Sequence, residues 1–339
     1  MTNISIISHK RVKALRRQNN EKTIKFAIAL AGSLLAVSAF AQSFPNRPIK
    51  LVVPFPPGGV TDIVARTLSV KLTEELKQSV IVENRAGASG AIGAEAVARS
   101  APDGYTWLMG NISTLAINQW TMAKLNYNPS TSFEPVAMVA VQPLLVVVNQ
   151  TVPVSTLSEL VAYAKKNPGK LNYGTAGSSI HLAVEYFSGL AGIKMNHIPY
   201  KGSSPAITDL LGGQVQVLFD PFSSIHPQVA AGKVKALAIS TAERSGIVPK
   251  VPTVIESGFA GFDVSSWQGI VMPAGTPKDI VVKMNAVINK ALKSKEVVDR
   301  FAQFSAVPTQ WTPQQFGQYI SQEQQRWSKV AKDAGVVPQ

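Results

Sequence analysis

The 339-residue chain contains no cysteine. Disulfides, thiolate metal sites and thiol nucleophiles are therefore excluded. Histidine is also scarce, with four residues, and none of them lies in a His-x-His or His-Glu-x-x-His pattern. Since no Asp-x-Asp-x-Asp-Gly spacing occurs either, the sequence predicts neither a metal site nor a metal cofactor.

Long hydrophobic runs are absent after residue 41, where no stretch of 18 apolar residues occurs, so no membrane-spanning helix is expected there. Before that point the chain has a basic segment from Lys10 to Lys25 and a short apolar run, Phe26–Val37. Ala39-Phe40-Ala41 then precedes Gln42. This order is typical of a cleaved secretory signal peptide, predicted over residues 1–41; the alternative is an uncleaved membrane anchor.

Acidic residues are fewer than basic ones: 20 acidic and 33 basic residues give a net charge of +13. The predicted signal peptide holds seven of the basic residues and one of the acidic ones, so the remainder carries +7. That charge is spread without a Lys/Arg run, which argues against a nucleic-acid groove. A mildly positive field would instead favour the recruitment of small anions. The length after residue 41 suits one large or two medium domains.

Strands and helices alternate along the chain, as judged from the spacing of apolar and turn residues. In the first half, strands are expected at 49–53, 80–82, 107–109, 136–139 and 144–148, and helices at 61–76 and 87–98. In the second half, strands are expected at 171–173, 197–200, 217–219 and 236–239, and helices at 156–167, 180–190, 204–211, 227–231, 278–293, 295–304 and 313–334. This alternation predicts an α/β protein with a mainly parallel sheet. Two similar α/β units would leave a cleft where loops leave the carboxyl ends of strands.

The loop Pro54–Asp62 is one candidate for such a ligand site. Its Pro-Pro-Gly-Gly segment is followed by a predicted helix, whose first N–H groups are unpaired and carry partial positive charge. A carboxylate would fit there without any arginine. The loop matches neither the Walker nor the Gly-x-Gly-x-x-Gly pattern. The alternative is an ordinary turn in which Thr61 or Asp62 caps the helix.

The loop Gly174–His181 is the second candidate, because it combines small residues, three hydroxyl groups and a helix start. Its N–H and O–H groups would bind another anionic group, or Ser178 or Ser179 would only cap the helix. His181 would donate to a ligand or hold the loop. Asp220 ends an apolar strand, and it would accept hydrogen bonds from a ligand amine or water, or cap the next segment of the chain.

A secreted α/β hydrolase that uses Ser178, His181 and Asp220 is the enzymatic alternative. A serine and a histidine three residues apart on one helix do not normally meet as nucleophile and base, and the Gly-x-Ser-x-Gly elbow is absent. The sequence therefore favours a binding protein that is not an enzyme.

Several ordered motifs resemble the Bug family, the TctC-like receptors of tripartite tricarboxylate transporters. The likeness runs from about Phe44 to near the C-terminus. It rests on Pro45-Asn46-Arg47-Pro48-Ile49, Val53-Pro54-Phe55-Pro56-Pro57-Gly58-Gly59 with Asp62, Val82-Glu83-Asn84-Arg85-Ala86-Gly87-Ala88-Ser89-Gly90, Pro102-Asp103-Gly104-Tyr105-Thr106, His197-Ile198-Pro199-Tyr200-Lys201-Gly202, Val251-Pro252-Thr253-Val254-Ile255-Glu256-Ser257-Gly258 and Pro273-Ala274-Gly275-Thr276-Pro277.

The resemblance implies a type II periplasmic-binding-protein fold, with two α/β lobes joined by two crossing strands. Lobe 1 would comprise residues 42–142 plus 266–339, and lobe 2 residues 143–265. The family binds carboxylates through the backbone and hydroxyl groups of two loops, often with bound water. Those loops map onto Phe55, Gly59, Thr61 and Asp62 in lobe 1 and onto Thr175, Ala176, Ser178, Ser179 and His181 in lobe 2, with Asp220 and Asn111 as further candidates. Many relatives have a hydroxyl or small residue in place of Val60 or Asn111, so ligand preference would differ.

The function expected from the resemblance is that of a monomeric periplasmic receptor. It would close on a small organic carboxylate, such as a di- or tricarboxylate, an aromatic acid or an amino acid, and deliver it to the permease of a tripartite tricarboxylate transporter. The alternative is a ligand sensor that feeds a two-component kinase without transport.

Overall fold

The computed structural model describes residues 44–338. The predicted signal peptide over residues 1–41 lies outside this range. Residues 47–338 form one compact unit. It contains all the helices and strands of the described range, and none of these helices has the length and hydrophobicity of a membrane-spanning segment.

The strands follow the predicted alternation with helices. The strands are β1 (Ile49–Val53), β2 (Val80–Asn84), β3 (Thr106–Asn111), β4 (Phe133–Asn149), β5 (Asn172–Thr175), β6 (Asn196–Pro199), β7 (Val217–Pro221), β8 (Val234–Ile239), β9 (Ser265–Pro273) and β10 (Val307–Pro308). The helices and short helical turns are α2 (Val60–Leu76), η1 (Ala88–Gly90), α3 (Ala91–Ala98), η2 (Ser113–Ile117), α4 (Asn118–Thr121), α5 (Leu157–Lys166), α6 (Ser178–Ala191), α7 (Ser203–Leu211), α8 (Phe222–Ala230), α9 (Lys278–Leu292), α10 (Lys295–Ala302) and α11 (Pro313–Asp333).

These strands form one sheet in the order β2-β1-β3-β9-β4-β7-β5-β6, and both β8 and β10 also pair with β4. The β2-β1-β3 group and the β6-β5-β7 group are each parallel. Strands β4 and β9 are antiparallel to each other and lie between these groups. The carboxyl ends of the parallel strands carry the loops that lead into α2, α6 and α7, which is where an α/β sheet binds ligands.

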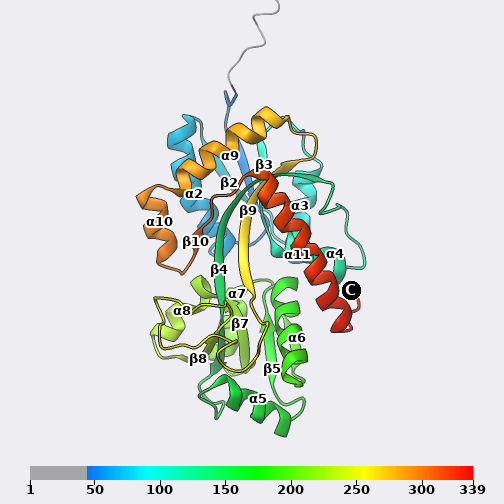
Figure 1. Ribbon diagram of the computed structural model, residues 1–339, viewed down its shortest axis with the longest axis vertical. Coiled ribbons are helices and arrows are strands. Elements are labelled where there is room, and N and C mark those ends of the chain that lie inside the picture. Colours follow the sequence, from blue (N-terminus) through cyan, green and yellow to red (C-terminus); the bar gives the residue numbers. More distant parts are fainter. Residues whose placement is uncertain (1–43, 339) are drawn as a thin grey trace, which may run out of the picture. The chain divides into compact units, whose positions relative to one another are not determined.

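The long strand β4 connects the two parallel groups (Figure 1). Its residues up to Pro143 pair with β9, whereas Leu144 and the residues after it pair with β7 and β8. The unit therefore has the two-lobed α/β fold that the resemblance implied. The first lobe contains β1, β2 and β3, and the second contains β5, β6 and β7. The residue boundaries given for the lobes remain a prediction.

Strand β4 also shows where the strand predictions were wrong. Two separate strands were expected at 136–139 and 144–148, with Pro135 before the first and Pro143 between them. Both prolines are instead accommodated within the strand, and the register against β9 shifts between Pro135 and Ala137. Strand β9 was not expected at all. It lacks a clear alternation because it is buried nearly throughout, and Gly269 leaves room for the ring of Phe316, 2.2 Å from where a Cβ would lie.

Helix α11 is anchored beside the crossing strands by a buried acid. Glu323 of α11 is 5% exposed, and its carboxylate accepts hydrogen bonds from the indole N–H groups of Trp267 in β9, at 3.1 Å, and Trp327, at 3.0 Å. Both indoles are fully buried. A buried carboxylate needs such partners, so this contact fixes the helix against the strand that links the lobes.

Candidate functional site

The first candidate loop leads from β1 into α2. Gly58 has a φ of +82°, which a glycine adopts without strain, and Gly59 is the N-cap of α2. No side chain caps this helix, so its first N–H groups are free to bind a ligand. The alternative in which Thr61 or Asp62 is the N-cap is therefore wrong.

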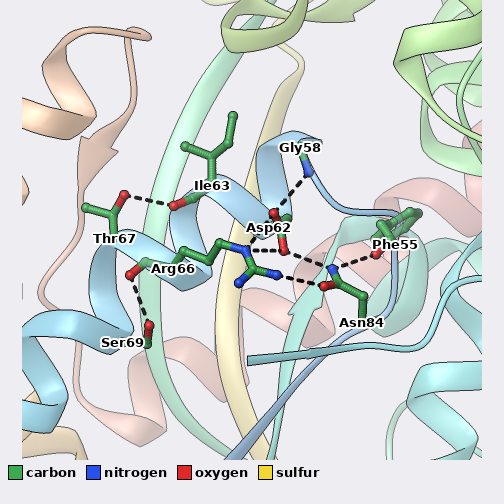
Figure 2. A network of polar contacts seen from close by, with 8 residues as sticks. All are labelled: Phe55, Gly58, Asp62, Ile63, Arg66, Thr67, Ser69 and Asn84. Carbon is green, nitrogen blue, oxygen red and sulfur yellow. Dashed lines mark hydrogen bonds and ion pairs between the residues drawn. The ribbon is translucent and has the colours of Figure 1, made fainter. Parts of the chain in front are cut away.

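Asp62 holds this loop in place (Figure 2). Its carboxylate accepts hydrogen bonds from the backbone N–H of Gly58 at 2.9 Å, the side-chain amide of Asn84 at 2.9 Å and Nε of Arg66 at 3.0 Å. The same Asn84 amide donates to the carbonyl of Phe55 at 3.0 Å. Burial alone would raise the pKa of Asp62, but the hydrogen bonds from Arg66, Gly58 and Asn84 outweigh it and lower the pKa. The carboxylate is therefore ionised and directed to its own loop.

The second candidate loop leads from β5 into α6 and has the same design. Gly177 is the N-cap, with a φ of +116°, and no side chain caps the helix. Thr175 is buried, and its hydroxyl lies 2.6 Å from Nε2 of His197 in the neighbouring strand β6. The first N–H groups of α6 are thus available at the cleft, while Thr175 is engaged behind the loop.

His181 stacks on His197, with ring centroids 4.0 Å apart and an angle of 8° between the planes. Burial lowers the pKa of His181. Burial and the nearby His181 lower the pKa of His197 to about 4. Both imidazoles are therefore neutral at pH 7. This arrangement matches the loop-holding alternative for His181, and the histidine is not among the residues that line the cleft between the two loops.

Asp220 lies at the end of β7 and is 1% exposed. Its Oδ1 accepts a hydrogen bond from the hydroxyl of Ser203 at 2.8 Å, and its Oδ2 has no partner within the described part of the chain. Burial raises the pKa of Asp220 to about 7, against the smaller lowering effect of the Ser203 bond. The carboxyl is therefore poised between its protonated and ionised forms near neutral pH.

A cleft of about 270 Å³ lies between the two loops. Six of the predicted residues line it: Phe55, Gly59, Thr61, Asn111, Ala176 and Ser179. The other five lie behind its surface: Asp62, Thr175, Ser178, His181 and Asp220. The structure thus brings both loops to one cavity, with about half of the candidates at its wall and the rest in contacts that support them.

The cleft is also lined by polar residues that were not predicted to belong to the site. They come from the β6–α7 loop, the β7–α8 junction, η2 and β9, and they include Lys201, Ser203, Ser204, Ser223, Ser224, Ser113 and Ser266. The β6–α7 and β7–α8 segments also follow the carboxyl ends of strands, so the rule that selected the first two loops would have found them. Ser113 and Ser266 carry no such signal.

The electrostatics of the cleft favour an anion. Lys201 is the one charged residue among the described residues that line it. Helix α7 starts after Gly202 and, like α2 and α6, has no side-chain cap. Helix N-termini carry partial positive charge and oriented N–H donors. Within the described residues, no cluster of three or more His, Cys, Asp or Glu residues suited to a metal ion occurs.

The three residues of the hydrolase alternative do not contact one another in the way a triad requires. The hydroxyl of Ser178 donates to Asn118, and the nearest acid to His181 is Glu185, at 4.0 Å. The contact of Asp220 is with Ser203. A nucleophile hydrogen-bonded to its base, itself oriented by an acid, is therefore not assembled from these residues.

Known proteins resemble this chain over most of its length. The family model described as "Tripartite tricarboxylate transporter family receptor" matches residues 64–336. Protein BugT of Bordetella pertussis is 42% identical over 311 residues, which cover 91% of this chain and 95% of BugT.

Solved structures of similar proteins have the same fold. A protein of R. palustris, Rpa4515 with adipate, has a TM-score of 0.84 at 36% identity and is matched over 88% of this chain and 100% of its own. MatC from Rhodopseudomonas palustris with bound malate has a TM-score of 0.80 at 35% identity, over 85% and 100% of the two chains. The periplasmic binding protein BugD has a TM-score of 0.82 at 36% identity, over 87% and 100%. The chain therefore belongs to the TctC family, the solute-binding receptors of tripartite tricarboxylate transporters that include the Bug proteins, and the resemblance seen in its sequence is confirmed.

Proposed function

We propose that this protein is a periplasmic receptor that captures a small organic carboxylate in the cleft between its lobes and delivers it to a tripartite tricarboxylate permease. The observation that carries the proposal is the lining of the cleft. It joins the uncapped starts of α2, α6 and α7 with serine hydroxyls and one lysine, and without any acid among the described lining residues. Such a lining suits an anion.

In this proposal one carboxylate of the ligand accepts hydrogen bonds from backbone N–H groups near Gly59 and Thr61. A second polar end accepts from the Ala176–Ser179 segment and approaches Lys201 at the start of α7. Phe55 and Asn111 complete the wall on the side of the first lobe. A ligand that touches both loops stabilises the closed arrangement of the lobes, because only that arrangement offers both sets of donors.

The candidates behind the wall have indirect roles in this proposal. Asp62 fixes the Gly58 backbone, and Thr175 and His181 fix the second loop through His197. Asp220 is different, because its Oδ2 is buried without a partner among the described residues. A ligand hydroxyl or amine, or a water molecule, would satisfy that atom.

A thermal-shift screen of the chain from residue 42 onwards tests the proposal. Adipate and malate are the first probes, because structures of similar proteins hold them. We expect at least one di- or hydroxycarboxylate to raise the melting temperature in proportion to the logarithm of its concentration, as a ligand that binds only the folded state does. Uncharged amides of the same acids serve as controls. Stabilisation by the amides but not by the acids would contradict the proposal.

Lys201→Glu is expected to weaken binding of a dicarboxylate about tenfold, because it replaces an attractive charge at the cleft by a repulsive one. Lys170→Glu is the matched control, since Lys170 is exposed in the same lobe and does not line the cleft. Isothermal titration at two salt concentrations measures both variants. Equal affinities for the two variants would show that Lys201 does not face the bound acid.

Two parts of the proposal concern the cell. The first is export by the signal peptide over residues 1–41, followed by action as a monomer in the periplasm. The second is delivery to a permease, for which the alternative is a sensor that feeds a two-component kinase. Deletion of the permease genes separates these two roles: uptake of the acid should stop if the receptor serves transport, whereas acid-dependent gene expression should stop on deletion of the kinase if it serves sensing.

A further inference from the structure

Two side-chain hydrogen bonds join the first turn of α6, in the second lobe, to the first lobe beside the cleft. The hydroxyl of Ser178, the first residue of α6, donates to Oδ1 of Asn118 in α4 at 2.7 Å. The hydroxyl of Ser113 in η2 donates to the hydroxyl of Ser179 at 2.9 Å. Asn118 and Ser113 follow β3 of the first lobe, and the two α6 serines follow β5 of the second. Both bonds form between protein groups and need no ligand.

Asn118 is held in one orientation by its own lobe. The residue is completely buried, and its side-chain amide donates to the carbonyl of Ser89 at 3.1 Å and to the hydroxyl of Tyr127 at 3.3 Å. The Tyr127 hydroxyl in turn donates to the carbonyl of Thr114 at 2.8 Å. With both amide hydrogens directed inward, Oδ1 is left as a fixed acceptor that faces the second lobe.

Ser178 completes this arrangement from the other side. It is 8% exposed, and its bond to Asn118 is the one hydrogen bond that its hydroxyl makes to the described residues. Neither Ser178 nor Asn118 lines the cleft. Separation of the lobes would break this bond, so its free energy belongs to the closed arrangement alone.

We propose that Asn118 and Ser178 form a latch that stabilises the closed lobes independently of any ligand. Ser178 then affects binding as a positioning residue: it stabilises the closed lobes and does not contact the acid itself. The effect on affinity rests on the proposed function, whereas the closure itself does not. The apparent dissociation constant scales inversely with the closed fraction, so a weaker latch weakens binding only by the factor by which that fraction falls.

Ser178→Ala measures the latch because it leaves Oδ1 of Asn118 buried without its partner in the closed arrangement. We expect the ratio of closed to open molecules to fall about tenfold in the ligand-free protein. Ser188→Ala is the matched control. Ser188 lies on the same helix and is buried, and its hydroxyl has no hydrogen-bond partner among the described residues.

The absence of cysteine from the chain makes the measurement direct. Ala162 in α5 and Ala286 in α9 are exposed helix residues in the two lobes, and cysteines introduced at both positions accept spin labels. Electron–electron double resonance then gives the distribution of distances between the lobes. In the ligand-free wild type and in Ser188→Ala we expect the distance of the closed structure to dominate, and in Ser178→Ala a second population to appear.

Asn118→Ala tests the latch from the side of the first lobe. It should open the lobes as Ser178→Ala does, and the double variant should be no more open than Asn118→Ala alone, because the two residues act through one bond. The proposal is overturned if Ser178→Ala and Ser188→Ala give the wild-type distribution, or if the ligand-free wild type lacks the closed distance. Failure of every acid in the thermal-shift screen would contradict the proposed function but leave this result unchanged.

Discussion

Asp62→Ala is expected to remove measurable acid binding, with a loss of at least about a hundredfold in affinity, and to lower the free energy of unfolding by about 3 kcal/mol. The carboxylate is 3% exposed and accepts from the Gly58 N–H, from Asn84 and from Arg66. Its removal takes the shared acceptor away from all three donors at once, and these hydrogen bonds are partly buried. It also releases the Gly58 turn, so the N–H groups at the start of α2 would no longer be held toward the cleft.

Chemical denaturation and calorimetric titration measure these two effects. The pH dependence gives an independent check. Because the pKa of Asp62 is lowered in the folded protein, its stabilising contribution is present above the ordinary pKa of an aspartate and is lost as the pH falls through the folded value. The stability difference between wild type and Asp62→Ala should therefore shrink in acid. A difference that grows as the pH falls would contradict this account of the loop.

Asp299→Ala is the control for that variant. Asp299 is an exposed carboxylate of α10 that pairs with Lys295. Exposed ion pairs contribute little, so a change within about 0.5 kcal/mol and unaltered binding are expected. Comparable losses in both variants would show that the effect of Asp62 does not come from its buried contacts.

The second large effect is a pH dependence of stability that arises from Asp220. Burial raises its pKa from 3.8 to about 7, so the folded protein retains a proton that the unfolded chain releases near pH 4. The unfolded state then binds fewer protons between these values, and stability falls as the pH rises from about 4 to 7 and is level above. The fall is on the order of 4 kcal/mol.

Asp220→Asn removes this titration while it keeps an oxygen that accepts from Ser203. The wild type should therefore lose stability relative to the variant as the pH rises. Between pH 4 and pH 8 we expect the free energy of unfolding of the variant to gain about 4 kcal/mol over that of the wild type. Urea denaturation at several pH values measures it. Parallel profiles for the two proteins would mean that the carboxyl is already ionised or solvated in the folded state.

Much of the fold and of the candidate site was predictable from local sequence signals, of which the first loop is an example. Pro56-Pro57-Gly58-Gly59 ends an apolar strand and precedes a 3.6-residue periodicity, and these signals depend on neighbours in sequence. The C-terminal helices α9, α10 and α11 were found in the same way. Strand β9 was missed because its burial against β3, β4 and Phe316 is a property of the tertiary structure.

About half of the predicted site residues line the cleft, and the others do not, because local patterns do not fix the direction of a side chain. The rule that ligands bind at the carboxyl ends of strands places Gly59, Thr61, Ala176 and Ser179 at the cleft, as the structure does. It does not say whether a polar side chain in such a loop faces the cavity or its own backbone. The carboxylate of Asp62 and the hydroxyl of Ser178 are both directed to protein partners in other segments, Asn84 and Asn118, that no local pattern connects to them.

In the function proposed here, an organic acid is held in the cleft by oriented N–H and O–H donors of the facing loop-to-helix junctions. A crystal structure with the acid that gives the largest thermal shift is the decisive measurement. We expect a carboxylate oxygen about 2.7–3.2 Å from backbone N–H groups at the start of α2, and a second polar group of the ligand within hydrogen-bond distance of the Ala176–Ser179 segment or Lys201. The proposal fails if the electron density of the acid lies outside this cleft and neither loop contacts it.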